Sequence, residues 1–339
     1  MTLVRERRHQ PALWLSLPPP VSAADFSHQT PLPSLQSSTG LDSPGIGNLS
    51  VLEKLAVLGH GNGGTVYKVR HQKTSSFYAL KVLRFGEDAV TIRQQAAREV
   101  EILKRVDSQY VVRCHGVFEN GFVNSDGGGD LCFVMEYMEA GSLHDVLRVR
   151  RRLPENVISG VARCVLEGLH YLHGMQIVHR DIKPSNLLIN GKGETKIADF
   201  GVSRVGAGTI EALDSYMGTC AYMSPERFDP ERWNGDCSDG FAGDVWSLGV
   251  VVLECHVGHF PFISPGQKPD WATLMCAICF GEKAEMPEKA SPEFQSFVWR
   301  CLEKDWRKRG TVAELLGHPF VTKCCDSTTE KMVDYALDC

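Results

Sequence analysis

The residues with the clearest chemical capacity lie in two short segments near the middle of the chain. The first is His179-Arg180-Asp181-Ile182-Lys183-Pro184-Ser185-Asn186, and the second is Asp199-Phe200-Gly201. The Asp181 carboxylate could receive the proton of a hydroxyl group, and Lys183 could face an anion. Asn186 and Asp199 offer the oxygen ligands that magnesium prefers. Together these residues predict metal-assisted phosphoryl transfer.

The order and spacing of these residues, HRDxxxxN followed by DFG, resemble the catalytic and metal-binding loops of eukaryotic protein kinases. The resemblance implies an α+β, bilobal protein kinase fold, with a small β-rich N-lobe that carries one regulatory helix and a larger, mainly helical C-lobe. It also implies ATP and Mg²⁺ as cofactors, with Asp181 receiving the acceptor hydroxyl and Lys183 meeting the γ-phosphate. Either motif alone could arise by chance, whereas the ordered pair is specific.

A glycine-rich segment, Leu58-Gly59-His60-Gly61-Asn62-Gly63-Gly64-Thr65-Val66, precedes them in the chain. The GxGxxG pattern alone is weak, because dinucleotide-binding loops use the same spacing. Those loops open a helix, whereas residues 65–69 continue here as a β-branched strand. We therefore expect a hairpin in which Gly59, Gly61 and Gly64 let the backbone lie over phosphates, with His60, Asn62 and Gly63 in the same ATP-binding loop.

The next predicted strand, residues 77–83, carries a single lysine between apolar residues. In this position Lys81 fits the residue that holds the α- and β-phosphates. A helix is predicted next, because Ile92, Ala96, Val100 and Leu103 recur at helical spacing. Glu99 and Glu101 are both candidates for an ion pair with Lys81, and the family pattern favours Glu99.

Several apolar residues fall where the resemblance implies that an adenine ring is held between the lobes. They are Leu58, Val66, Ala79, Met135 and Leu188, with Met138 in the expected hinge, residues 135–143. For each residue taken singly, core packing explains the apolar side chain at least as well.

The pattern also predicts how the chain is organised around these residues. Two strands, 110–119 and 131–137, are joined by a glycine-rich segment that we expect to be a mobile hairpin tip. Helix starts are predicted at Ser142, Pro154, Ser291 and Thr311, and residues 245–257 predict a central helix that is apolar almost all round. We expect a disordered arm (1–50), a kinase domain (52–321, with an N-lobe 52–137 and a C-lobe 139–321) and a short tail (322–339).

Residues 218–227, GTCAYMSPER, are more specific than the shared kinase motifs, and they resemble the MAP kinase kinases. Thr209 and Ser215 match the Ser/Thr-x5-Ser/Thr phosphorylation pair of plant members, whereas animal members have S-x3-S. We expect an upstream MAP kinase kinase kinase to phosphorylate this pair and switch the enzyme on, with Arg180 pairing with a loop phosphate. Thr219 and Ser224 are the alternatives, and we expect them to be structural.

The arm contains a segment, residues 5–17, that suits docking of an extended peptide. Arg5, Arg7 and Arg8 precede Leu13 and Leu15, so a basic cluster is followed by apolar side chains at alternate positions. Composition alone favours a solvated tail, but the MAP kinase kinase resemblance favours docking to a MAP kinase. It also implies dual specificity, with phosphorylation of the Thr and the Tyr in the TxY loop of that MAP kinase.

Composition limits the other function classes. A chain of 339 residues is long enough for two lobes, and a net charge of −5 gives no whole-chain reason to expect nucleic-acid or membrane binding. No apolar run reaches the roughly 20 residues that span a bilayer, and prolines interrupt the N-terminal apolar patch, so we expect a protein of the cytoplasm or nucleus. We also expect it to be a monomer. The 12 cysteines show no framework and are expected to be reduced. Cys276 and Cys279 form a CxxC that we interpret as buried helix thiols rather than a metal or redox site.

Two alternative functions are weighed against an active MAP kinase kinase. A pseudokinase or scaffold would lack a catalytic element, yet Lys81, Asp181, Asn186 and Asp199 are all present. A kinase of another tier, such as a MAP kinase kinase kinase, would differ in which substrate residues it phosphorylates.

Overall fold

The computed structural model of the chain describes residues 46–61, 64–84, 99–120, 130–199, 220–229, 232, 240–263, 270–282 and 284–323. The chain divides into residues 1–38 and residues 39–339, and all described residues belong to the second unit. Several predicted features lie outside the described residues: the docking segment 5–17, Asn62, Gly63, the hairpin tip 121–129, Thr209, Ser215, Thr219 and the tail from 324. Their assignments stay predictions.

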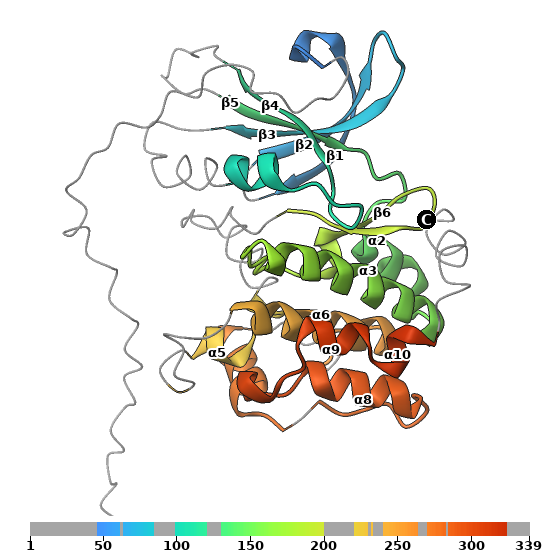
Figure 1. Cartoon of the computed structure of the whole chain (residues 1–339), viewed down its shortest axis with the longest axis vertical. Coiled ribbons are helices and arrows are strands. Elements are labelled where there is room, and N and C mark those ends of the chain that lie inside the picture. Colours follow the sequence, from blue (N-terminus) through green and yellow to red (C-terminus); the bar gives the residue numbers. More distant parts are fainter. Residues whose placement is uncertain are drawn as a thin grey trace, which may run out of the picture. The chain divides into compact units, whose positions relative to one another are not determined.

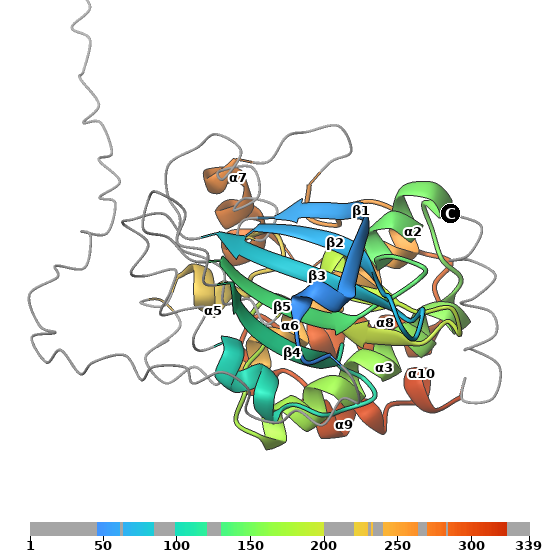
Figure 2. The ribbon, with the colours of Figure 1, turned by 90° about the horizontal axis from the view of Figure 1, so that it is seen from above.

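Five antiparallel strands form the N-lobe sheet in the order β1-β2-β3-β5-β4, which Figure 2 shows from above. They are β1 (Leu52–Gly61), β2 (Gly64–His71), β3 (Phe77–Arg84), β4 (Cys114–Asn120) and β5 (Asp130–Glu136). Buried apolar side chains, among them Val69, Leu80 and Val134, cover one face of the sheet. Alternate residues point to opposite faces of a strand, so Lys81 lies on the other face, toward the C-lobe.

The N-lobe begins earlier than the sequence predicts. A 3₁₀ turn, η1 (Leu49–Val51), precedes β1, and the Asn48 side chain accepts a hydrogen bond from the Ser50 N–H (3.0 Å). Ile46 and Leu49 pack against the apolar cluster of the sheet. Residues 46–50 are therefore part of the folded unit rather than of the disordered arm, because two apolar contacts and one cap hold them.

The strand predicted to start at Tyr110 starts only at Cys114. Residues 110–112 pair instead with β7 (Thr195–Ile197) of the C-lobe. The Val112 N–H donates to the Ile197 carbonyl (2.9 Å), and the Ile197 N–H donates to the Tyr110 carbonyl (2.8 Å). The apolar pattern suits either partner, so the sequence did not reveal the change of partner.

The C-lobe is mainly helical and is centred on α6 (Gly240–Val257), which lies between α3 (Glu155–Gly174) and α8 (Pro292–Cys301) (Figure 1). The other helices are α2 (Leu143–Arg150), α5 (Pro225–Phe228), α7 (Trp271–Met275), α9 (Val312–Leu316) and α10 (Pro319–Thr322). The described part of the lobe also contains two 3₁₀ turns, η2 (Pro184–Asn186) and η5 (Trp306–Lys308), a π-helical turn, η4 (Cys276–Phe280), and a hairpin of β6 (Leu187–Ile189) and β7. The predicted α+β architecture, a small β-rich lobe and a larger, mainly helical lobe, is confirmed.

The predicted apolar faces are buried as expected. The α3 stripe from Ile158 to Leu172 is covered, and α6 begins at Gly240, five residues before the predicted start. By length and composition α6 could cross a membrane, but two thirds of that window is buried within the protein, as for the core helix of a globular domain. Gly249 permits close packing of α6 on α8, since a Cβ there would lie 2.5 Å from Cys301 Cβ.

Side-chain caps confirm three predicted helix starts. Ser142 with Asp145, and Thr311 with Glu314, each form a capping box, at α2 and α9 respectively. Ser291 accepts a hydrogen bond from the Phe294 N–H (3.1 Å) at the start of α8. At α3, Pro154 occupies the cap position and provides no side-chain hydrogen bond.

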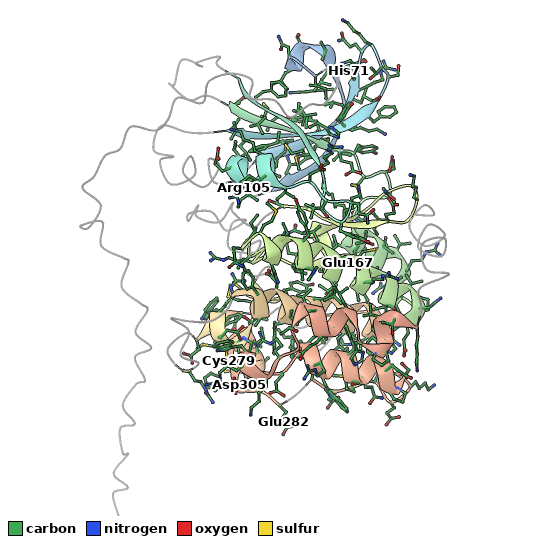
Figure 3. The ribbon with its side chains drawn as sticks, in the orientation of Figure 1. His71, Arg105, Glu167, Cys279, Glu282 and Asp305 are labelled. Atoms are coloured by element: carbon green, nitrogen blue, oxygen red, sulfur yellow. The ribbon has the colours of Figure 1, made fainter. Side chains whose placement is uncertain are left out.

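The two cysteines of the CxxC lie in different surroundings. Cys279 is buried beside α5, with its thiol 3.8 Å from the Pro225 carbonyl (Figure 3). Cys276 is exposed, so the prediction that both thiols are buried was wrong. The pair lies in a π-helical turn, η4 (Cys276–Phe280), whose wider turn alters which residues face the core. Both thiols are free, and the described residues contain no group of His, Cys, Asp and Glu that could hold a metal ion.

Candidate active site

Lys81 lies where the sheet, a helix and the C-lobe meet. On β3 it is opposite Val66 of β2 and Phe133 of β5, so the sheet fixes its position. Its Nζ atom is 3.0 Å from Glu99 Oε1 and 3.1 Å from Asp199 Oδ1. Glu99 belongs to helical residues 99–105, and Asp199 follows β7. One ammonium group thus joins three separate parts of the fold.

Glu99, rather than Glu101, forms the ion pair with Lys81, as the family pattern implied. Its side chain is 5% exposed, whereas the Glu101 side chain is 68% exposed and lies 3.4 Å from Lys104 Nζ. The helical period explains the difference, because Glu99 is four residues before the buried Leu103 and shares its face.

These ion pairs determine the charge states of Lys81 and Asp199. Burial acts to lower the pKa of Lys81, but the carboxylates of Asp199 and Glu99 outweigh it, and the pKa is raised. The Lys81 charge in turn lowers the pKa of Asp199, although burial opposes this. Lys81 and Asp199 are therefore both ionised at neutral pH, so one can hold an anion and the other a cation.

Asp181, Lys183 and Asn186 form a second cluster, in the loop between α3 and β6. Asn186 Nδ2 donates to Asp181 Oδ2 (2.8 Å) and to the Asp181 carbonyl (2.9 Å). Lys183 Nζ is 3.2 Å from Asp181 Oδ2. The η2 turn brings Asn186 back to Asp181. The Asp181 carboxylate is thereby held in one orientation beside a cation, as suits a residue that receives a hydroxyl proton.

The residues also fit a magnesium ion. Because both Asn186 Nδ2 hydrogen bonds go to Asp181, the amide oxygen, the atom that binds hard cations, is turned away from Asp181. The Ala198 N–H donates to the Asn186 carbonyl (2.9 Å). This bond places Asp199, which follows β7, close to Asn186, which precedes β6. An amide oxygen and an ionised carboxylate are the donor set that Mg²⁺ prefers.

Asp244, near the start of α6, anchors this loop, and sequence reasoning missed it. Its Oδ2 accepts from the His179 N–H (2.9 Å) and its Oδ1 from the Arg180 N–H (2.7 Å). His173 Nε2 is also 2.9 Å from Oδ2. The signal available in the sequence was an acidic residue in the most apolar helix, where Asp244 and Glu254 are the only two, since buried charges require partners.

Two residues of the site have left-handed backbone conformations, which residues other than glycine rarely adopt. The φ angle is +68° at Arg180 and +58° at Asp199. Such conformations cost about 1–3 kcal/mol each and persist where surrounding contacts enforce them. Asp244 supplies that contact for Arg180, and Lys81 supplies it for Asp199.

The predicted adenine residues come from both lobes. Ala79 and Met135 are cross-strand partners in the sheet, and Leu188 lies on β6, bridged to Ser142. Met138 is buried, whereas Leu58 is 47% exposed on β1. Gly59, His60 and Gly61 pair with Val66, Thr65 and Gly64, so the glycine segment is a β-hairpin, as predicted, and does not open a helix.

Comparison with known proteins decides the family. A family model for the protein kinase domain matches residues 52–321. Mitogen-activated protein kinase kinase 10 of Arabidopsis thaliana is 55% identical over 323 residues, which is 95% of this chain and 99% of the relative. Mitogen-activated protein kinase kinases 9 and 7 of the same plant are 52% and 50% identical, each over 95% of this chain and 99% of the relative. The chain belongs to the MAP kinase kinases.

In this MAP kinase kinase, the described end of the activation segment is anchored by a buried ion pair. Arg309 donates to both carboxylate oxygens of Glu226 (2.8 and 3.0 Å), and the two side chains are 0% and 1% exposed. The Ser224 hydroxyl is fully buried beside this pair, so a kinase could reach it only after the segment unfolds. Arg180 is exposed, and its carbonyl accepts a hydrogen bond from Arg227 (2.8 Å).

Proposed function

We propose that this MAP kinase kinase uses ATP and Mg²⁺ to phosphorylate the Thr and the Tyr in the TxY loop of a MAP kinase. One observation carries the proposal: Lys81 contacts Glu99 and Asp199, and the adjoining loop holds Asp181 against Asn186 and Lys183. Phosphoryl transfer requires mainly positioning and charge stabilisation, and these residues supply both.

Each residue has a distinct role in the proposed reaction. Asp181 orients the acceptor hydroxyl and receives its proton, and Lys183 neutralises charge next to it. Lys81 and the backbone of residues 59–64 hold the phosphates, while Leu58, Val66, Ala79, Met135, Met138 and Leu188 line the adenine site. Asn186 and Asp199 hold Mg²⁺, which when bound offsets the charge on the phosphate oxygens.

The proposed switch is phosphorylation of Thr209 and Ser215 by an upstream MAP kinase kinase kinase. A phosphate on the loop adds about two negative charges, and the exposed Arg180 guanidinium can pair with it next to the catalytic carboxylate. The burial of Ser224 supports Thr209 and Ser215 as the residues that are phosphorylated.

The proposed partners follow from the same family membership. Arg5, Arg7, Arg8, Leu13 and Leu15 dock the arm on the MAP kinase substrate, and the enzyme works as a monomer in the cytoplasm or nucleus. Alanine at the three arginines should raise KM for a MAP kinase several-fold and leave turnover of a short peptide unchanged.

The switch is tested by comparing three samples of the enzyme: one treated with an activating kinase, one treated with a phosphatase, and the Thr209→Ala/Ser215→Ala variant treated with the activating kinase. We expect activity only in the first sample. Equal activity in the first two samples would exclude the switch, and full activity of the variant would assign it to other residues.

A further inference from the structure

Lys196, on β7, has no role in the proposed function, yet it lies next to the predicted adenine site. In the β6–β7 hairpin, Leu188 and Lys196 are directly opposite each other. Their neighbours along the strands, Leu187, Ile189 and Ile197, are buried in the C-lobe. Because side chains alternate along a strand, Lys196 shares the opposite face with Leu188, the predicted floor of the adenine site.

From this floor Lys196 reaches the N-lobe. Its Nζ atom is 2.7 Å from Oε1 of Glu136, and the two side chains are 12% and 25% exposed. Glu136 is the last residue of β5 and directly follows Met135, at the start of the expected hinge. Such a shielded pair attracts more strongly than an exposed one, since water and salt screen it less.

Glu136 is also held from the other side. Its backbone N–H donates to the Arg113 carbonyl (2.8 Å), and its Oε2 accepts from the Arg113 N–H (3.2 Å). The carboxylate is therefore fixed between the segment before β4 and Lys196. A lysine that binds it also restrains the backbone of β5 at the hinge.

The same hairpin holds the far end of the hinge. The Gly191 N–H donates to Glu139 Oε2 (2.8 Å), and the Ala140 N–H donates to the Ile189 carbonyl (3.1 Å). Residues 136–140 are thus bound at both ends to the β6–β7 hairpin, which carries Leu188. The ion pair is the connection nearer the N-lobe.

We propose that the Lys196–Glu136 ion pair positions the hinge against the floor of the nucleotide site and so favours ATP binding. Lys196 is a positioning residue, which acts through Glu136 and the hinge backbone. The inference rests on the proposed function, because it takes ATP as the ligand of this cleft. Preorganisation of this kind lowers the cost of binding without altering the chemical step.

The test is steady-state kinetics of the activated enzyme, with calorimetric titration of Mg-ADP. Lys196→Met should raise KM for ATP and Kd for ADP about tenfold and change kcat less than about twofold, since ground-state and transition-state binding weaken alike. Lys196→Arg keeps the charge and should restore most of the affinity. Lys192→Met is the matched control, because Lys192 is exposed at the turn of the same hairpin and should have no effect.

A double-mutant cycle completes the test. Glu136→Gln should weaken ADP binding similarly, and the double variant with Lys196→Met should be no worse than either single variant. Unchanged or tighter ADP binding by Lys196→Met, or a loss in kcat alone, would overturn the inference. A wild-type enzyme that bound no nucleotide would instead contradict the proposed function, so the two failures are distinguishable.

Discussion

Lys81 and Asp199 are 118 residues apart in the chain, yet Lys81 Nζ lies 3.1 Å from Asp199 Oδ1. The contact joins the third strand of the N-lobe to the segment that follows β7 in the C-lobe. Glu99 holds the same ammonium group at 3.0 Å. The two carboxylates therefore keep a cation at the point where the lobes meet.

Removal of Lys81 should destabilise the protein more at neutral pH than in acid. In the folded protein Lys81 lowers the pKa of Asp199, compared with about 3.9 in an unfolded chain. A group of this kind contributes stability at neutral pH that is lost as the pH falls through its folded pKa. In Lys81→Met burial acts unopposed and raises the pKa of Asp199 and Glu99, so their protonation in acid favours the folded variant, and the stability lost at neutral pH should be regained as the pH falls. Urea unfolding followed by circular dichroism at neutral and at acidic pH measures this, with Lys104→Met, whose lysine pairs with the exposed Glu101, as the control. A loss in stability that is equal at both pH values, or larger in acid, would contradict it.

Two glycines of the hairpin should respond differently to alanine. A Cβ on Gly64 would lie 1.8 Å from the Val82 carbonyl oxygen, whereas one on Gly59 would meet nothing within 4 Å. Gly64→Ala should therefore lower the free energy of unfolding by about 1–3 kcal/mol, as overpacking does. Gly59→Ala should change it by less than about 0.5 kcal/mol and raise KM for ATP several-fold. Urea unfolding and ATP kinetics would separate the two, and equal destabilisation would show that Gly59 serves packing.

Asp244→Asn should impair the catalytic loop. The carboxylate accepts two backbone hydrogen bonds, from His179 and Arg180, and an amide can accept with one oxygen only. We expect a loss of about 1.5–3 kcal/mol in stability, as for hydrogen bonds to charged groups, and a fall in kcat of at least about tenfold. Asp270→Asn is the matched control, since asparagine caps α7 as well as aspartate does. Unchanged kcat in Asp244→Asn would show that the loop does not depend on this anchor.

The Glu226–Arg309 pair should be costly to break from one side. Arg309→Met leaves a buried carboxylate unpaired and should cost about 3–5 kcal/mol. Adding Glu226→Gln removes that charge, so the double variant should lose less than the sum of the single losses. Arg300→Met, in the exposed pair with Glu314, should cost less than about 1 kcal/mol. Chemical denaturation of Arg309→Met, Glu226→Gln, the double variant and Arg300→Met measures these losses. Additive losses in the first three would mean that the pair does not act as a unit.

Sequence reasoning was most successful where one local pattern sufficed. The apolar stripe of α3 and the caps at Ser142 and Thr311 depend on residues a few positions apart, and the structure has them as predicted. The family pattern favoured Glu99 over Glu101, and the helical period explains that choice, because Glu99 shares a face with the buried Leu103.

Features set by distant partners were missed. Asp244 contacts residues 64 and 65 positions away, and Lys196 meets Glu136 across 60 positions, so no local pattern reports either contact. The late start of β4 has the same cause, since residues 110–112 pair with β7 and not with β5. Cys276 became exposed because a π-helical turn, which the period of 3.6 does not anticipate, interrupts its helix.

The central claim is that this cleft transfers phosphate to a MAP kinase. The most direct measurement is mass spectrometry of a panel of catalytically inactive plant MAP kinases after incubation with the activated enzyme and Mg-ATP. We predict phosphate on both the Thr and the Tyr of the TxY loop in at least one of them, and on neither residue with Asp181→Ala or Lys81→Met. Phosphate on neither residue with the wild type, or equal phosphorylation by Asp181→Ala, would contradict the account.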